Sequence, residues 1–219
     1  MTSAWELIST ERQGQAGRRV IVAKTFRMPD GSKTVFTVTG DASSRSVACV
    51  ALTPRQSAVL AEQYRPGPER LMRELPGGGV EPGESLAASA ARELAEETGY
   101  VPEELIYLGE MCYDAYFGGS GHYFLATGCE RRREQQLDPG EFVTVGEVPL
   151  GDLVRLAMTG GMTDPGGVLL ALQIITAAET AGHARVAEMN RQVTDNLDKI
   201  ITALQAEEPD GKEASSSAS

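Results

Sequence analysis

The segment from Glu74 to Tyr100 constrains the fold of this chain more than any other stretch. It reads ELPGGGVEPGESLAASAARELAEETGY, and between residues 85 and 98 its apolar side chains recur at helical spacing. Ser85 is a favoured residue at a helix start and Gly99 at a helix end. The pattern therefore predicts a helix over 85–98 that is entered from a glycine-rich loop.

Strand-like runs precede and follow this helix. Residues 20–23 and 35–38 flank the Pro-Asp-Gly turn at 28–31 and predict an N-terminal antiparallel hairpin. Residues 47–52 and 58–64 predict a second antiparallel pair. Further strands are predicted at 107–113, 123–127 and 142–145.

Three more helices are predicted in the C-terminal third. The first covers 150–158, and the second begins at Asp164-Pro165, because Asp can cap a helix and Pro fits its first turn. The third covers about 183–204 and carries an apolar stripe that must dock on its own domain or on a second subunit. The polar, serine-rich end of the chain is predicted to be disordered.

Composition excludes several classes of protein. The 219 residues include 20 Lys and Arg against 31 Asp and Glu, and the net charge of −11 disfavours binding to nucleic acid. The longest apolar stretch, 168–178, is too short to cross a membrane. We expect no signal peptide in the first twenty residues, and Cys49, Cys112 and Cys129 fit no metal-binding spacing. We expect buried thiols and a cytoplasmic protein.

Three glutamates share one face of the helix predicted over 85–98. Glu93, Glu96 and Glu97 are spaced by three and four residues, so their like charges repel. Divalent cations would reverse this effect, because carboxylate oxygens are hard ligands suited to Mg²⁺ or Mn²⁺. The alternative to metal binding is that the three glutamates form a solvated acidic face of the helix. The three glycines at 77–79 let the backbone approach a ligand closely, so a carbonyl there can reach the same metal.

Residues 78–100 follow the pattern G-x5-E-x7-R-E-L-x-E-E-x-G-Y, which resembles the Nudix box. The departure is Tyr100, where the family usually has an aliphatic residue. The resemblance implies a Nudix fold, of class α/β (α+β), with a mixed sheet sandwiched between helices. It also implies hydrolysis of a nucleoside diphosphate linked to another group.

The resemblance further implies a role for each residue of the motif. The metal ligands would be the Gly77 carbonyl and the carboxylates of Glu93, Glu96 and Glu97, with Glu96 either a direct ligand or bound through water. Two or more Mg²⁺ (or Mn²⁺) ions would be held. The residues that orient the motif would be Gly78, Glu84, Arg92 and Gly99. A plain surface ion pair is the alternative for Arg92 and Glu84.

The resemblance also implies a catalytic base on the loop 130–141. Glu141 is the first choice, followed by Asp138 and Glu134, and each of these has a solvated loop charge as its alternative. Glu96 would serve if no loop residue reaches the attacking water.

The sequence EQYR at 62–65, followed by ELPGG, resembles the ADP-ribose pyrophosphatase branch of the family. Arg65 would then bind substrate phosphate, or else form a loop ion pair. The branch usually forms homodimers through N-terminal strands. Residues 116–121 read YFGGSG where the branch has Ser-Pro-Gly. The nucleobase and the sugar of the substrate are therefore not determined by the resemblance. Nearby side chains have two interpretations each, as ligand contacts or as packing: Tyr113, Tyr116, Phe117 and His122.

These predictions divide the chain into four parts. They are an N-terminal β segment at 1–41 with dimer-forming strands, a Nudix domain at 42–180, an extra helix at 181–204 and a disordered tail at 205–219. The leading hypothesis is a metal-dependent hydrolase that cleaves ADP-ribose, or a related nucleoside diphosphate sugar, to a nucleoside monophosphate and a sugar phosphate. Dinucleotide polyphosphates or nucleoside triphosphates are alternative substrates. A ligand-sensing Nudix domain is the alternative outside enzymes.

Overall fold

A computed structural model describes residues 5–17 and 19–177 of the chain. In chain order its elements are β1 (Glu6–Ala16), β2 (Arg19–Arg27), β3 (Lys33–Thr39), β4 (Arg45–Leu52), β5 (Ser57–Arg65), β6 (Arg70–Glu74), β7 (Gly77–Gly79), α1 (Leu86–Thr98), β8 (Tyr100–Val101), β9 (Glu104–Met111), β10 (Ser120–Thr127), β11 (Glu130–Arg131), β12 (Thr144–Pro149), α2 (Leu150–Met158) and α3 (Pro165–Ala177). The helix predicted over 183–204 and the predicted disordered tail lie outside the described residues.

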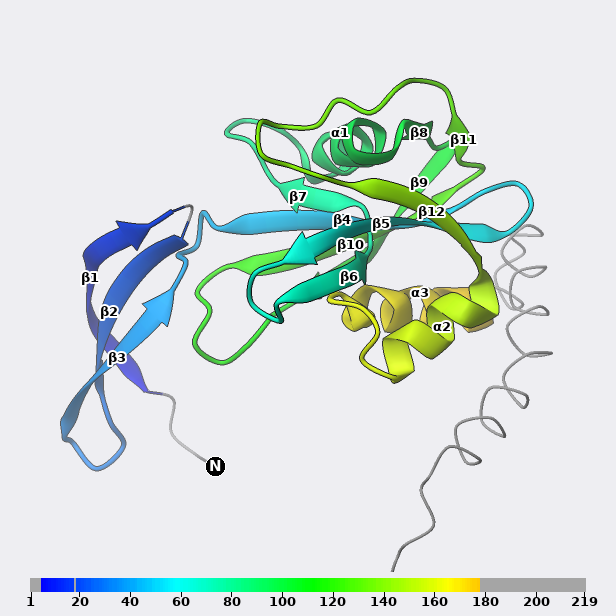
Figure 1. The fold of residues 1–219 in the computed structure, drawn as a ribbon. Coiled ribbons are helices and arrows are strands. Elements are labelled where there is room, and N and C mark those ends of the chain that lie inside the picture. The colour runs from blue at the N-terminus through cyan, green and yellow to red at the C-terminus, as the bar shows by residue number, and fades with distance from the viewer. Residues whose placement is uncertain (1–4, 18, 178–219) are drawn as a thin grey trace, which may run out of the picture.

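The N-terminal hairpin is confirmed, and a third strand extends it. β2 and β3 pair antiparallel across a turn in which the Gly31 N–H donates to the Met28 carbonyl at 2.9 Å. β1 pairs with the other edge of β2 and gives the order β1-β2-β3. Sequence periodicity did not reveal β1, because nearly all its side chains are exposed. Figure 1 shows this small sheet standing beside the rest of the molecule.

A mixed sheet forms the centre of the main body. Its strand order is β12-β5-β4-β10-β9, with β6 added beside β5 and β7 beside β4. β4 and β10 run parallel, whereas the other pairs are antiparallel. Figure 1 shows α1 on one face of this sheet and α2 with α3 on the other. The predicted sandwich of a mixed sheet between helices is therefore confirmed.

Alternate residues of β4 build the two sides of the core. Val47, Cys49 and Ala51 lie in one apolar cluster with Ala90 and Leu94 of α1. The intervening side chains lie in a second cluster with residues from α2 and α3: Ala48, Val50, Leu52, Leu153, Val154, Val168 and Ile175. β4 is thus packed on both faces. Its position is therefore fixed, and so is that of β7, which is hydrogen-bonded to it.

The predicted helix over 85–98 is confirmed as α1, and both of its ends follow the predicted chemistry. The Ser85 hydroxyl accepts a hydrogen bond from the Ala88 N–H at 3.2 Å. Gly99 ends the helix with a φ of 76°, and its N–H donates to the Ala95 carbonyl. A Cβ at this position would lie 2.2 Å from the Arg133 carbonyl oxygen, so glycine is required there for space as well as for conformation.

Three predictions about local structure were wrong. The last strand was expected at 142–145 but runs from Thr144 to Pro149, and Phe142 is 85% exposed on the preceding loop. The glycines at 77–79 were expected in a loop and instead form β7, paired with β4. Cys112 was expected to be buried but is exposed, whereas the other two cysteines are buried. Within the described ranges no helix has the length and apolar character needed to span a membrane.

Candidate active site

The glycine strand β7 lies directly against the acidic face of α1. The Gly77 N–H donates a hydrogen bond to the Glu97 carboxylate at 2.9 Å. A Cβ on Gly77 would meet the Val47 carbonyl oxygen at 2.1 Å, and a Cβ on Gly78 would meet the Glu93 carboxylate at 2.5 Å. Side chains on these two residues would therefore push β7 away from β4 or from the helix. The triplet allows backbone and carboxylates to come together.

Arg92 organises the carboxylates on this face. Its Nε and Nη2 donate to the two oxygens of Glu84 at 3.1 and 3.0 Å, and Nη2 also donates to the Gly79 carbonyl at 3.1 Å. Its Nη1 donates to Glu93 and to Glu96, each at 2.9 Å. The guanidinium thus joins the loop before α1, the strand β7 and the helix, with the planar bidentate geometry that suits arginine.

Burial disfavours the charged form of the carboxylates on this face of α1. Glu97 is only 7% exposed, and desolvation raises its pKa to about 8, helped by the carboxylates of Glu93, Glu141 and Glu74. Burial also raises the pKa of Glu93. Crowded carboxylates in a weakly polar environment favour either protonation or a bound cation.

A cavity of about 140 Å³ opens between β7, α1 and the loop 132–143. Its lining combines the glycine triplet, the α1 carboxylates and two acids of the loop: Gly77, Gly78, Gly79, Glu81, Arg92, Glu93, Glu96, Glu97, Gln136, Asp138 and Glu141. Of the three proposed loop bases, the structure brings Glu141 and Asp138 to this cavity. Glu134 is not part of the lining, since its side chain is 92% exposed and pairs with Arg131 at 3.2 Å.

The loop is held in place by the C-terminal end of α1. The Gln135 side-chain amide donates to the Glu97 carbonyl at 2.6 Å and to the Val143 carbonyl at 3.2 Å. The Gln136 N–H donates to the Glu96 carbonyl at 2.8 Å. These bonds satisfy carbonyls that a helix end leaves without partners, and they tie the loop that carries Glu141 to the helix. No sequence pattern singled out Gln135.

The donor set of the small cavity suits a hard divalent cation. Carboxylate and backbone oxygens are the ligands that Mg²⁺ and Mn²⁺ prefer, and the glycines admit such an ion close to the backbone. In this arrangement Arg92 engages Glu93 and Glu96, and the described residues contain no group of three or more acidic, histidine or cysteine side chains positioned to hold a metal ion. Arg92 contacts one oxygen of each carboxylate, Oε1 of Glu93 and Oε2 of Glu96.

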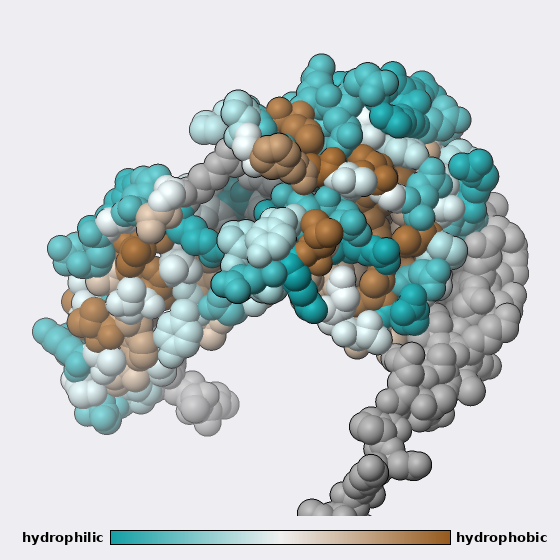
Figure 2. Space-filling view, in the orientation of Figure 1, coloured by the Kyte–Doolittle hydropathy of each residue, from teal (hydrophilic) through white to brown (hydrophobic). Residues whose placement is uncertain are grey.

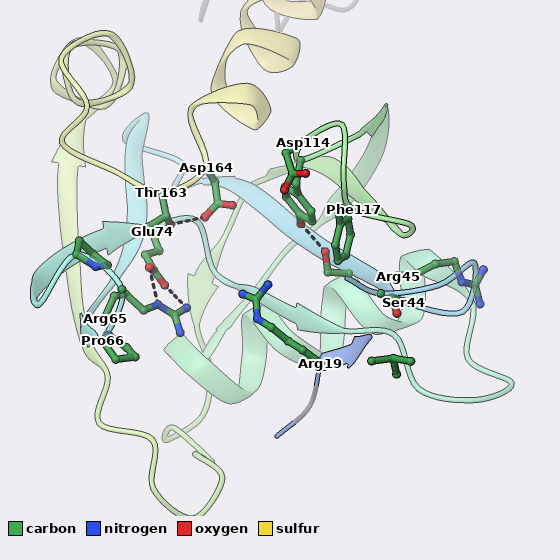
Figure 3. Close-up of a pocket in the computed structure, with 16 residues that line it drawn as sticks. Arg19, Ser44, Arg45, Arg65, Pro66, Glu74, Asp114, Phe117, Thr163 and Asp164 are labelled. Carbon is green, nitrogen blue, oxygen red and sulfur yellow. Dashed lines mark hydrogen bonds and ion pairs between the residues drawn. The ribbon is translucent and has the colours of Figure 1, made fainter. Parts of the chain in front are cut away.

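A larger pocket of about 820 Å³ lies between the N-terminal sheet and the main sheet, and its lining is drawn in Figure 3. Arg65 lines it and is clamped by the buried Glu74, which accepts from Nε at 2.6 Å and from Nη2. Gln63 donates to the same carboxylate at 3.1 Å. Arg65 is therefore both a pocket residue and a member of an ion pair. No sequence pattern pointed to this role of Glu74.

The aromatic residues before β10 divide between this pocket and the N-terminal sheet. Tyr113 and Phe117 line the pocket, whereas Tyr116 packs near Phe36 of the N-terminal sheet. His122 is buried, with ring nitrogens 3.0 Å from the hydroxyls of Tyr107 and Ser120, and lies in the lining of neither cavity. Its surroundings favour the structural interpretation.

Comparisons with known proteins identify several relatives of this chain. The chain is 31% identical over 140 residues to the methanol dehydrogenase activator of Bacillus methanolicus, covering 63% of this chain and 75% of that protein. It is 37% identical over 115 residues to the ADP-ribose pyrophosphatase of Bacillus subtilis (strain 168), covering 51% of this chain and 61% of that protein. The ADP-sugar pyrophosphatase of Mus musculus is 30% identical over 165 residues, with 68% of this chain and 75% of that protein covered.

The fold also matches a solved structure described as a crystal structure of ADP compounds hydrolase. The TM-score is 0.69 at 18% identity, over 84% of this chain and 99% of the other. Residues 42–166 match the sequence model of the NUDIX domain, which covers more than half of the chain. The chain therefore belongs to the Nudix family.

Proposed function

We propose that this protein is a metal-dependent Nudix hydrolase that cleaves the pyrophosphate bond of ADP-ribose or a related nucleoside diphosphate sugar. The products are a nucleoside monophosphate and a sugar phosphate. The observation that carries the proposal is the small cavity in which the α1 carboxylates, the glycine strand and Glu141 meet. Two relatives named as an ADP-ribose and an ADP-sugar pyrophosphatase support the substrate class.

Glu93, Glu96, Glu97 and the Gly77 carbonyl are proposed to hold two or more Mg²⁺ or Mn²⁺ ions. Bound metals would neutralise the phosphates and lower the pKa of the attacking water. The protein's own contribution is to fix the ligands: Gly77 holds Glu97 through its N–H, and Glu84 holds Arg92 against the acidic face. Gly78 and Gly99 keep β7 and the loop close to the helix.

The proposal is tested with a panel of ADP-ribose, other nucleoside diphosphate sugars, dinucleotide polyphosphates and nucleoside triphosphates. Products are separated by chromatography, with Mg²⁺, with Mn²⁺ and with EDTA. We expect ADP-ribose or another diphosphate sugar to give a nucleoside monophosphate, and we expect EDTA to abolish turnover. Preference for a triphosphate or a dinucleotide would contradict the substrate class, and absence of turnover would favour a ligand-sensing role.

Glu141 is proposed as the general base, because it lies in the small cavity on a loop that α1 holds. Glu141→Gln should lower kcat by about a hundredfold while changing KM little, since general bases contribute in this range. Glu134→Gln is the matched control on the same loop and should keep the wild-type kcat. Equal losses in both variants would contradict the assignment, and Asp138→Asn would then be compared with Glu96→Gln.

The protein is proposed to form a homodimer through its N-terminal sheet and to act in the cytoplasm. Leu7, Ile8 and Val35 are large apolar side chains on this sheet, and each is at least 40% exposed. Figure 2 shows apolar side chains gathered on the same lobe. Sedimentation equilibrium should give twice the chain mass for the wild type and a monomer for a Leu7→Glu, Val35→Glu double variant. A monomeric wild type would contradict the dimer.

A further inference from the structure

The chain between β9 and β10 brings two aromatic rings into the large pocket of about 820 Å³. Tyr113 and Phe117 both line this pocket, with ring centroids 5.3 Å apart and ring planes inclined at 60°. Figure 3 shows the ring of Phe117 at the border of the pocket. Tyr113 is 48% exposed, so the fold leaves about half of its surface uncovered. We call this pair of rings the aromatic corner.

Three glycines make room for the aromatic corner. A Cβ on Gly121 would lie 2.5 Å from the Tyr113 hydroxyl oxygen. A Cβ on Gly119 or on Gly40 would lie 2.8 Å from the ring of Phe117. A side chain at any of these positions would displace a ring. Two of the glycines of the YFGGSG sequence at 116–121 therefore hold the rings where they are.

Hydrogen bonds fix the same loop to the two sheets. The Tyr113 hydroxyl shares a hydrogen bond with the Ser46 hydroxyl of β4. The Thr39 N–H of β3 donates to the Tyr116 carbonyl at 2.9 Å, and the Gly118 N–H donates to the Thr39 carbonyl at 2.8 Å. Because the rings are already held in place, a ligand that covers them loses little free energy in ordering them. The aromatic corner is thus preorganised for contact with a ligand.

Charge alone does not define the ligand of this pocket. Its lining holds as many arginines as acidic residues, namely Arg19, Arg45, Arg65, Glu74, Asp114 and Asp164. The aromatic corner instead favours a flat ring, which stacks on one aromatic face and meets the edge of the other. A nucleobase is such a group, and the pocket volume lies in the range of sites that enclose an organic ligand.

Arg65 gives the direction in which a nucleotide would lie. Figure 3 shows Arg65 and Phe117 on different sides of this pocket. The hydrogen bond to Glu74 raises the pKa of Arg65, and the negative charge of Glu97 on α1 adds to this effect. Arg65 therefore lies within electrostatic reach of the α1 carboxylates. A nucleotide with its base at the aromatic corner and its phosphates toward Arg65 has those phosphates directed toward α1.

We propose that the aromatic corner, Tyr113 with Phe117, binds the nucleobase of the substrate by stacking. This inference rests on the proposed function and deepens it, because it assigns the nucleoside half of the nucleoside diphosphate sugar to the large pocket. Every nucleobase has a π face, so stacking here tolerates more than one base.

Equilibrium binding tests the inference without any turnover. Calorimetry in Mg²⁺ compares AMP with ribose 5-phosphate, which carries the same phosphate and sugar but no base. AMP should bind the wild-type protein at least about tenfold more tightly, within the usual gain from stacking one base on an aromatic side chain. An AMP affinity no higher than that of ribose 5-phosphate, including no binding of either compound, would overturn the inference.

Tyrosine variants decide whether the aromatic corner is responsible. Tyr113→Leu should lose most of the gain, whereas Tyr113→Phe, which keeps the ring, should retain it. Tyr116→Leu is the matched control, because Tyr116 is exposed and lies outside the pocket lining. Circular dichroism checks that all three variants are folded. A gain that persists in Tyr113→Leu, or that Tyr116→Leu abolishes equally, would overturn the inference.

Hydrolysis separates this inference from the proposed function. On a nucleoside diphosphate sugar, Tyr113→Leu should raise KM by about tenfold and change kcat little, since the stacked base is held in the ground state and the transition state alike. If AMP binds as expected but no compound with a pyrophosphate bond is hydrolysed, the proposed function fails and the nucleobase site stands. Hydrolysis without a gain for AMP would overturn the nucleobase site alone.

Discussion

Glu97→Gln is expected to lower kcat by at least about a hundredfold while leaving the protein folded. Glutamine keeps the shape of the side chain and an oxygen for the Gly77 N–H, which lies 2.9 Å from the carboxylate. The substitution removes only the negative charge that a metal ligand supplies, and even residues that merely support metal ligands cost ten- to a hundredfold when changed. Steady-state hydrolysis with saturating Mg²⁺ measures the loss.

The control for this experiment is Glu134→Gln, because Glu134 is exposed and lies outside the small cavity. Circular dichroism checks that both variants keep the wild-type secondary structure. Wild-type turnover in a folded Glu97→Gln protein would show that Glu97 is not a metal ligand.

Gly77→Ala is expected to lower the free energy of unfolding by about 3 kcal/mol, the upper part of the range for overpacking. The new methyl group would meet the Val47 carbonyl oxygen at 2.1 Å, and β4 cannot retreat because apolar clusters pack on both of its faces. Gly79→Ala is the matched control in the same strand. Nothing lies within 4 Å of a Cβ there, so its effect should stay within about 0.5 kcal/mol.

Urea unfolding followed by circular dichroism compares these two variants under identical conditions. The difference between Gly77 and Gly79 tests whether β7 is pressed between β4 and α1 as described. Equal stability of the two alanine variants would contradict that packing.

The sequence predicted best where local chemistry decides the structure. α1 has a capping serine, a glycine that adopts positive φ and an apolar stripe, so all its signals lie within fifteen residues of one another. The Nudix motif lies on the same segment, which is why the acidic face of the site was predicted together with the helix. The hairpin of β2 and β3 likewise has its turn signal between its strands.

Features without a local signal in the sequence were missed. β1 has almost no buried side chain, so its pairing with β2 leaves no apolar alternation to detect. Gln135 acts through bonds to Glu97 and Val143, which only the folded loop brings within reach. For the same reason the sequence ranked Glu141 above Glu134 without a geometric basis, whereas the structure separates them by the lining of one cavity.

The carboxylates of α1 are proposed to hold the divalent cations on which hydrolysis depends. Titration of Mn²⁺ followed by electron paramagnetic resonance measures this directly, on the wild type and on a Glu93→Gln, Glu97→Gln double variant. We predict that the wild type binds Mn²⁺ and hydrolyses its substrate as the sites fill, and that the folded double variant loses both properties. Mn²⁺ binding of wild-type strength in the double variant would contradict the account.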